Sequence, residues 1–283
     1  MTLQTPTTAT TAIAHRWIAP APGLDDFQEV RDLKVSWACC EEEVRQAQRL
    51  RYSVFAMEMG AKLTSPTGMM PGLDVDAFDP FCDHLLVRAV SRSDDDDGLL
   101  VGTYRVLAPD AARRAGGLYI DTEFDLTPLS SLRSRAVELG RCCVHPSWRS
   151  GGVILALWSA LCRYMHVHRL ETMIGCASVG LKDGGHLAEA LWGSLRTTHL
   201  VESRWQVQPH IALPLAISGD IPAAPVGACR MTSMPALIKG YLRCGTRLLG
   251  PPALDTAFNT ADLPMMLRLS DLTPRYRKHF LGN

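Results

Sequence analysis

The chain has 283 residues, of which 47% are hydrophobic, and its 29 Lys and Arg residues balance its 29 Asp and Glu residues. Such a composition excludes collagen-like, disordered and disulfide-knot proteins. The neutral total also argues against a general nucleic-acid binder, because such proteins normally carry a basic excess. We therefore expect a globular protein with a sizeable core and no nucleic-acid partner.

Cysteine usage and apolar runs indicate the compartment. The nine cysteines include the adjacent pairs Cys39–Cys40 and Cys142–Cys143 but no Cys-x-x-Cys spacing. We expect free thiols in a reducing compartment and no metal site. The N-terminal sequence lacks a basic segment followed by an apolar one, and the longest apolar run, 151–162, is shorter than the roughly 20 residues of a membrane span. These features predict a cytoplasmic protein.

Three segments are expected along the chain. Residues 1–30 are rich in Thr, Ala and Pro without periodicity and predict a flexible leader. Residues 31–220 are assigned to the main domain. Residues 221–283 are assigned to a C-terminal extension of further helical and loop segments, packed on the same domain.

Hydrophobic periodicity predicts the elements of the main domain. The expected strands are 33–39, 84–90, 99–108, 136–145, 172–179 and 210–217, and the expected helices are 41–59, 151–167 and 185–195. A loop rich in aspartate, 60–83, follows the first helix, and the acidic run 94–97 predicts a solvated hairpin turn. An antiparallel meander that continues into strand–helix–strand indicates a mixed α/β fold, with a mainly antiparallel central sheet flanked by helices.

Four groups of polar residues lie where a purely structural chain would not require them. They are Arg51 with Phe55 one helical turn on; the loop residues Asp74, Asp76, Asp79, Asp83 and His84; Arg105 inside a strand; and Glu138 with Arg141. Strand geometry places Glu138 and Arg141 on opposite faces, but a bulge at Gly140 would bring both to one side. Taken alone, these residues fit either a functional site or an ion-pair network between strands, with the acidic loop as a solvated turn.

At these positions the sequence resembles the acyltransferases related to acyl-homoserine lactone synthases, a branch of the GNAT superfamily. The shared pattern is Arg-x-x-x-Phe, acid-x-Asp-x-aromatic-Asp, a strand Arg and Glu-x-x-Arg, in this order. Within that branch the chain is similar to the L-ornithine Nα-acyltransferase family over roughly 33–281. The supporting text is DPFCDHLLV, ELGRCCVHPSWR and GYLRCGTRLLGPPALDTAFNTADLPMMLRLSDLTPRYRKHF.

The resemblance implies a GNAT-like fold and transfer of a 3-hydroxyacyl chain from acyl carrier protein to the α-amine of L-ornithine, which yields lyso-ornithine lipid. It implies no bound cofactor, because the acyl donor is the phosphopantetheine thioester of the carrier protein, or acyl-CoA. The phosphate-binding loop of the GNAT superfamily usually reads Arg/Gln-x-x-Gly-x-Gly/Ala. Here Arg149 and Gly152 fit that spacing, but Ile154 replaces the last small residue. We therefore expect Arg149, Gly151 and Gly152 to hold the single phosphate of phosphopantetheine.

The resemblance also suggests roles for the site residues. N-acylation needs an unprotonated amine, and Glu138 is the candidate base, directly or through one water. Arg105 and Arg141 are assigned with it as catalytic residues, and backbone N–H groups of the strand are expected to stabilise the oxyanion. No covalent acyl-enzyme is required.

The remaining polar residues are assigned to substrate binding. Arg51 or Arg105 is expected to clamp the carboxylate of the amino acid. The acidic loop is the expected docking site for its cationic side chain. The full set of substrate-binding residues is Arg51, Phe55, Asp74, Asp76, Asp79, Asp83 and His84.

A basic stretch follows the main domain. Residues 221–254 contain Arg230, Lys239, Arg243 and Arg247 and no acidic residue. Their helical spacing among apolar residues predicts a surface, through 235–250, for acidic acyl carrier protein or for peripheral contact with an anionic membrane. The alternative is an ordinary amphipathic helix packed on the core, with its cations in solvent.

Three other functions stay open. One is acylation of a different amino acid. A second is a homoserine-lactone-type signal synthase that uses S-adenosylmethionine, although the Trp of those enzymes is missing between Phe55 and Asp74. A third is a non-catalytic acyl-binding or membrane-binding protein, which would not need both Glu138 and Arg105.

Overall fold

The computed structural model describes residues 32–63, 71–90, 98–149, 151–214 and 234–282. The predicted leader, the predicted hairpin turn at 94–97, Arg230 and the end of the strand expected at 210–217 lie outside these ranges.

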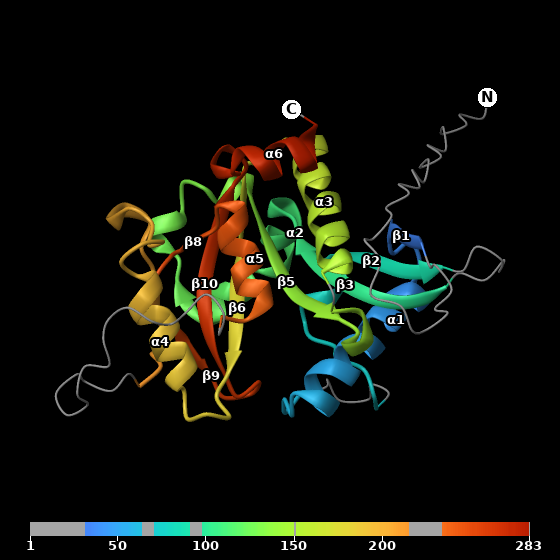
Figure 1. Cartoon of the computed structure of the whole chain (residues 1–283), viewed down its shortest axis with the longest axis horizontal. Coiled ribbons are helices and arrows are strands. Elements are labelled where there is room, and N and C mark those ends of the chain that lie inside the picture. The colour runs from blue at the N-terminus through green and yellow to red at the C-terminus, as the bar shows by residue number, and fades with distance from the viewer. Residues whose placement is uncertain (1–31, 64–70, 91–97, 150, 215–233, 283) are drawn as a thin grey trace, which may run out of the picture.

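An eight-stranded, mainly antiparallel sheet forms the centre of the molecule (Figure 1). Its order is β1-β2-β3-β5-β6-β10-β8, with β9 paired to β10, and β5 with β6 is its parallel pair. The expected mixed α/β sheet is thus confirmed. The strands are β1 (Asp32–Trp37), β2 (Asp83–Val90), β3 (Leu99–Leu107), β5 (Ala136–Val144), β6 (Thr172–Gly180), β8 (Arg247–Leu248), β9 (Ala253–Asp255) and β10 (Thr260–Arg268), and the two-stranded pair β4 (Phe124–Asp125) and β7 (Gln208–Pro209) lies apart from them.

The described helices include all three that the sequence predicted. They are α1 (Glu41–Tyr52), α2 (Pro109–Ala115), α3 (Gly152–Val167), α4 (His186–Leu195), α5 (Ala236–Cys244) and α6 (Pro274–Leu281). The first predicted helix continues beyond α1 as a π-helical segment, Ser53–Glu58. Among the described helices, none combines the length and the hydrophobicity that crossing a bilayer requires.

Helices cover both faces of the sheet. Leu85 and Val87 of β2 pack in one cluster with Leu157 of α3, whereas the intervening Leu86 packs with Leu50 of α1. Because alternate strand residues point to opposite faces, α3 and α1 lie on opposite sides, which we call the α3 face and the α1 face. Helices α4 and α5 join the cluster of the α3 face, and Figure 1 shows α3 and α5 in front of the sheet.

The prediction of a late strand at 210–217 is wrong for residues 210–214, the part that the structure describes. Here the chain forms the short β7 and a single bridge from Ala212 to Ala253, and the long strand after β6 is β10, which pairs with β6 over nine residues. Strand β10 is buried on both faces and contains Pro264, so it lacks the alternation that identifies a half-buried strand. The proline is tolerated because it lies between the residues paired to β9 and those paired to β8.

Strands β5 and β6 pair for only three residues and then separate. The parallel register ends at Glu138 opposite Ile174. In β5 the pairing with β3 moves from Gly140 opposite Arg105 to Cys143 opposite Thr103, so one extra residue is present, and Arg141 has φ 54°. A bulge next to Gly140, which the sequence suggested as a way to bring Glu138 and Arg141 to one side, is present.

The approach of β6 to β5 requires Gly175. A Cβ at this position would lie 2.2 Å from the carbonyl oxygen of Leu139. Because backbone would have to move, we expect Gly175→Ala to lower the free energy of unfolding by about 1–3 kcal/mol in urea titrations.

Gly193→Ala in α4 is the matched control. Nothing lies within 4 Å of its added Cβ, and alanine favours a helix over glycine by about 1 kcal/mol. This variant should be as stable as the parent or more so. Equal midpoints for the two variants would contradict the tight contact between β5 and β6.

Candidate active site

A polar cavity lies beside the point where β5 and β6 separate. Residues of β3, β5, β6 and β10 and the 3₁₀ helix Tyr119–Thr122 form its walls. The polar side chains that line it are those of Arg105, Tyr119, Glu138, Arg141, Ser178 and Asp262. The structure therefore brings all three residues predicted as catalytic to one cavity.

Glu138 is the buried carboxyl group of this cavity. One oxygen accepts the backbone N–H of Tyr119 at 2.6 Å and the other accepts that of Ile120 at 2.7 Å. Burial raises the pKa of Glu138 to about 7, although these two N–H groups and Arg105 act in the opposite direction. A carboxyl group with this pKa exchanges a proton readily near neutral pH.

Arg141 projects from the bulge onto two aromatic rings. Its guanidinium carbon lies 5.0 Å from the ring centroid of Tyr119 and 4.6 Å from that of Phe258. Its Nη2 donates to Asp76 at 3.1 Å, and its buried Nε forms an ion pair with Asp74 at 3.4 Å. Arg141 thus brings a cation to the wall of the cavity.

Arg51 is enclosed by the acidic loop. Its side chain is 1% exposed, and it donates from Nε to Asp74 at 2.8 Å and from Nη2 to Asp79 at 2.8 Å. Burial acts to raise the pKa of Asp79, but the charges of Arg51 and Arg105 hold it below its usual range. Arg51 therefore ties α1 to the loop, and this placement weighs against its predicted contact with substrate.

Arg105 and Arg141 complete the same ion network. Arg105 Nη1 contacts Asp76 at 2.6 Å and Asp79 at 3.1 Å, and Arg141 contacts Asp76. The three aspartates at 74, 76 and 79 are thus balanced by three arginines. A loop whose charge is already compensated has little attraction left for a cationic substrate, which weighs against its predicted role as the docking site.

The other predicted binding residues occupy different positions. His84 is 3% exposed, with Nε2 3.3 Å from the carbonyl oxygen of Asp79, and burial lowers its pKa. Asp83 is exposed and accepts the hydroxyl of Tyr164 at 2.8 Å, outside the network. Phe55 meets Phe258 edge to face at 5.8 Å and so supports the ring beneath Arg141.

The predicted phosphate loop lies at the start of α3. Gly151 is the N-cap residue with φ 104°, a left-handed conformation that favours glycine, and Gly152 begins the helix. Arg149 is half-exposed and makes a two-point ion pair with Glu58 at 2.6 and 2.8 Å. To bind a phosphate, Arg149 would exchange one anionic partner for another.

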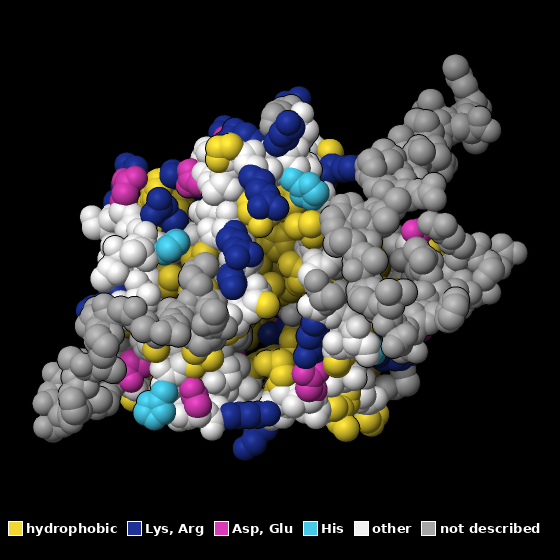
Figure 2. Space-filling view, viewed as in Figure 1, with side chains coloured by type: hydrophobic (Ala, Val, Ile, Leu, Met, Phe, Trp, Pro, Cys, Tyr) yellow, Lys and Arg dark blue, Asp and Glu magenta, His cyan; other side chains and the backbone are white. Residues whose placement is uncertain are grey.

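An apolar cavity lies beside the polar one. Both share Leu139 and Cys176, at the separation of β5 and β6. Met173 and Met265 of its wall belong to the cluster of the α3 face, as do Trp158 and Tyr241. Figure 2 shows hydrophobic side chains around a hollow between α5 and α3 on this face.

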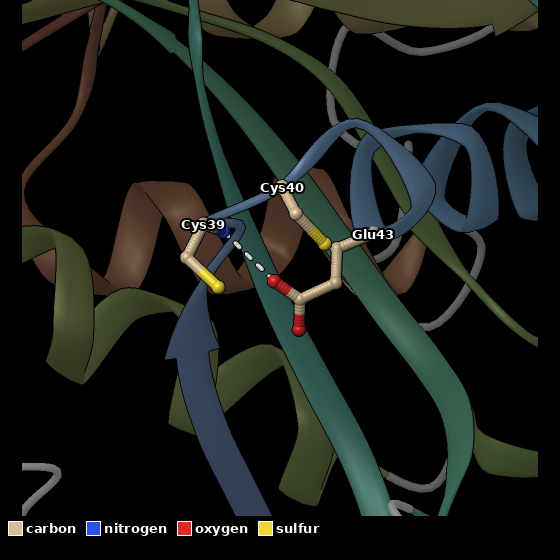
Figure 3. Close-up of side chains that lie close together, drawn as sticks. All are labelled: Cys39, Cys40 and Glu43. Carbon is tan, nitrogen blue, oxygen red and sulfur yellow. Dashed lines mark hydrogen bonds between the residues drawn. The ribbon is translucent and has the colours of Figure 1, made fainter.

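Two groups of side chains have the composition of a metal site. In each of them, Cys39, Cys40 and Glu43, and Glu123, Cys176 and Asp262, the potential ligand atoms lie within 4.8 Å of one another. In the first group Glu43 accepts the backbone N–H of Cys39, two residues before α1 begins, at 2.8 Å (Figure 3). The hydrogen bond with Glu43 raises the pKa of the exposed Cys39 thiol, so it favours the protonated form, which binds metals poorly.

Neither Tyr119 nor the group around Glu123 was predicted from the sequence. Glu123, Cys176 and Asp262 come from three distant segments, so no local spacing marks them. The eight described cysteines are free thiols, as expected.

Comparisons with known proteins give the class. Residues 50–159 match the acetyltransferase (GNAT) domain family. FeeM, an N-acyl amino acid synthase from uncultured soil microbes, has the same fold, with a TM-score of 0.52, 10% identity and coverage of 87% of this chain and 97% of that one. With the bulged β5 and the cavity beside it, the chain is an acyltransferase of the GNAT class.

Sequence relatives give the family. The chain is 36% identical to an L-ornithine N(alpha)-acyltransferase of Agrobacterium fabrum, over 90% of this chain and 87% of the relative. It is 34% identical to one of Rhodobacter capsulatus, over 84% of this chain and 91% of the relative. The chain belongs to the L-ornithine N(alpha)-acyltransferase family, which confirms the resemblance seen in the sequence.

The buried network makes a prediction about stability. Arg51→Met leaves Asp74 and Asp79 without their main cation, and removing one partner of a buried pair costs about 3–5 kcal/mol. We expect a loss of this size in the free energy of unfolding, measured in urea.

Arg49→Met on the same helix is the control. Arg49 pairs with Glu42 at 2.7 Å, but both side chains are about half-exposed, and such surface pairs contribute about 0–1 kcal/mol. If Arg51→Met were no more destabilising than Arg49→Met, the network would not hold α1 to the loop.

Proposed function

We propose that the chain transfers an acyl group from a thioester to the α-amine of L-ornithine. The observation that carries the proposal is the meeting of Glu138 and Arg141 in one cavity, at the separation of β5 and β6. The relatives named L-ornithine N(alpha)-acyltransferase support the choice of ornithine.

In the proposed step the amine nitrogen attacks the thioester carbonyl carbon. The amine proton passes to Glu138, directly or through one water, and a tetrahedral oxyanion forms. Its collapse forms the amide and breaks the carbon–sulfur bond, and the departing thiolate takes up a proton to leave as a thiol. Glu138 is suited to the base role because its pKa of about 7 lies near the working pH.

Arg141 is proposed to hold the carboxylate of the amino acid. It lines the cavity beside Glu138, and its guanidinium group lies against the ring of Tyr119, which lines the same cavity. A guanidinium group matches a carboxylate in charge and shape. Arg105 is 4% exposed and its Nη1 is engaged with both Asp76 and Asp79, so we assign it to positioning the wall of the cavity.

The apolar cavity is proposed to hold the acyl chain. The amino acid would then lie on the polar side of the separated strands and the chain on the apolar side, with the thioester carbonyl at Leu139 and Cys176, which both cavities share. This division matches the chemistry of the two substrates, because each surface meets a group of its own polarity.

The acyl donor is proposed to be the phosphopantetheine thioester of acyl carrier protein, with a 3-hydroxyacyl chain and lyso-ornithine lipid as product. Helix α5 buries Ile238 and Tyr241 in the core and leaves Lys239 and Arg243 on its outer side. Figure 2 shows Lys and Arg side chains along α5 and α6 beside the hollow. Such a rim fits an acidic carrier protein.

The same cations are proposed to allow peripheral contact with an anionic membrane at the cytoplasmic face. Because the apolar side of α5 packs on the core, this contact would be electrostatic and would weaken as salt is added.

A product assay tests the proposal. The chain is incubated with 3-hydroxyacyl carrier protein or the matching acyl-CoA, and with ornithine, lysine, glutamine, glycine or S-adenosylmethionine, and the products are identified by mass spectrometry. We expect Nα-acyl-ornithine as the main product and faster turnover with the carrier protein. A lactone product would favour a signal synthase, and acyl binding without any acylation would show a non-catalytic protein.

Glu138→Gln tests the base. We expect a loss of about 10²–10⁴-fold in turnover. In the parent, kcat/KM should fall as pH drops below about 7, because Glu138 becomes protonated and can no longer accept the amine proton. The contribution of Glu138 should be absent from the pH profile of the variant, which should keep only the fall caused by protonation of the ornithine α-amine, whose pKa is about 8.

Two controls accompany this experiment. Glutamine would point an amide N–H at a backbone N–H of the 3₁₀ helix, so circular dichroism and thermal unfolding must confirm the fold. Glu171→Gln, an exposed carboxylate paired with Arg135, should leave turnover unchanged. Full activity of Glu138→Gln between pH 6 and 9 would remove Glu138 from the base role.

A further inference from the structure

A second acidic group lies beside the polar cavity. Asp262 of β10 and Cys176 of β6 line the cavity, and Glu123, which follows the 3₁₀ helix, reaches both. The Cys176 thiol lies 3.6 Å from a carboxylate oxygen of Glu123. We call Glu123 and Asp262 the distal carboxyl pair; Asp262 lines the same cavity as Arg141 and Glu138.

The distal carboxyl pair has no compensating cation. Among the described residues no Lys, Arg or His makes an ion pair with either group, and a further acid, Asp255, adds to the charge that raises the pKa of Glu123. The acidic loop differs, because three arginines balance its three aspartates. The distal pair is therefore an acidic group beside this cavity that no described cation compensates.

One acceptor atom of the pair is buried without a partner. Oε1 of Glu123 is shielded from solvent and has no hydrogen bond among the described residues. Asp262 is 5% exposed; its side chain accepts the Thr260 hydroxyl at 2.9 Å and also hydrogen-bonds Ser178 and Glu123. A buried acceptor left unpaired is unfavourable, so a donor from outside the chain would stabilise this arrangement.

The pKa shifts of the two carboxyl groups agree with their burial and with the lack of a cation beside them. Burial and the charges of neighbouring acids raise the pKa of Glu123, and burial raises that of Asp262. A bound cation would reverse these shifts by supplying the missing positive charge.

We infer that Glu123 and Asp262 bind the distal ammonium group of the amino-acid substrate and so select a diamino acid over a neutral one. The inference rests on the proposed function, since it assigns the second amine of the same substrate. Arg141 holds the carboxylate and Glu138 receives the α-amine at one end of the cavity, while the side-chain ammonium reaches the distal pair at the other. Both ends of a zwitterion with a cationic side chain thereby meet opposite charge.

An ammonium group fits the pair better than a metal ion does. Burial raises the pKa of the Cys176 thiol well above its ordinary value, so the thiol remains protonated and is a poor metal ligand. Without the thiolate only two carboxyl groups remain, fewer than the ligand set of a dedicated metal site.

Glu123→Gln and Asp262→Asn test the inference against substrates that differ at the side chain. Ornithine, lysine, 2,4-diaminobutyrate and norvaline are compared, because norvaline lacks the distal charge. We expect each variant to lose about tenfold or more in kcat/KM for ornithine, mainly through KM, where tenfold corresponds to about 1.4 kcal/mol. The kcat/KM for norvaline should change less than threefold, so the ratio of kcat/KM for ornithine to that for norvaline should decrease. Asp125→Asn, an exposed neighbour that caps a turn through Thr127, is the matched control and should behave as the parent.

Calorimetric binding of ornithine and norvaline, without acyl donor, separates the two proposals. Ornithine bound through the pair but never acylated would refute the proposed function and leave the cation site standing. Acylation with an unchanged ornithine-to-norvaline ratio in both variants would refute the cation site and leave the function standing. Activity of the parent that is lost on treatment with EDTA and restored by zinc would also overturn the inference, because it would assign the pair to a metal.

Discussion

The separation of β5 from β6 is the constraint on which the site depends. Two parallel strands that stayed paired would close the sheet, but here the ladder ends at Glu138 and the bulge at Arg141 turns the next residues of β5 away. Gly175 permits the last close contact before the strands part. The separation lets a polar cavity and an apolar cavity meet at Leu139 and Cys176.

The buried ion network explains why so many charged residues lie near this opening. Its three arginines and three aspartates come from α1, the loop after it, β3 and β5, and each charge is met by an opposite one. Such a network is strongly sensitive to the loss of one member, since the remaining charge is buried alone. Its main effect is to hold Arg141 in place at the wall of the cavity.

Charge balance then separates structural acids from acids available to a ligand. The aspartates of the acidic loop look like a cation site when read along the chain, yet their charge is consumed by Arg51, Arg105 and Arg141. Glu123 and Asp262 have no compensating cation among the described residues, and their raised pKa values favour the protonated forms until a cation binds. The acidic loop and the distal carboxyl pair are both groups of largely buried acids, and they differ in the neighbours that the fold places beside them.

The sequence alone determined the class of fold, most of its strands and helices, and the residues of the family pattern, because hydrophobic periodicity and short spacings are local properties. It also indicated the bulge beside Gly140, which marks a local departure from strand geometry. It did not reveal β10, whose two buried faces erase the alternation, nor the neutralised state of the acidic loop.

Only the tertiary structure decided which charges meet. It paired Arg51 with Asp74 and Asp79, and it placed Glu123 beside Asp262 from positions far apart in the chain. The physical reason is that a carboxylate is compensated or left free by neighbours in space, and these neighbours come from long-range strand pairing that no local pattern encodes.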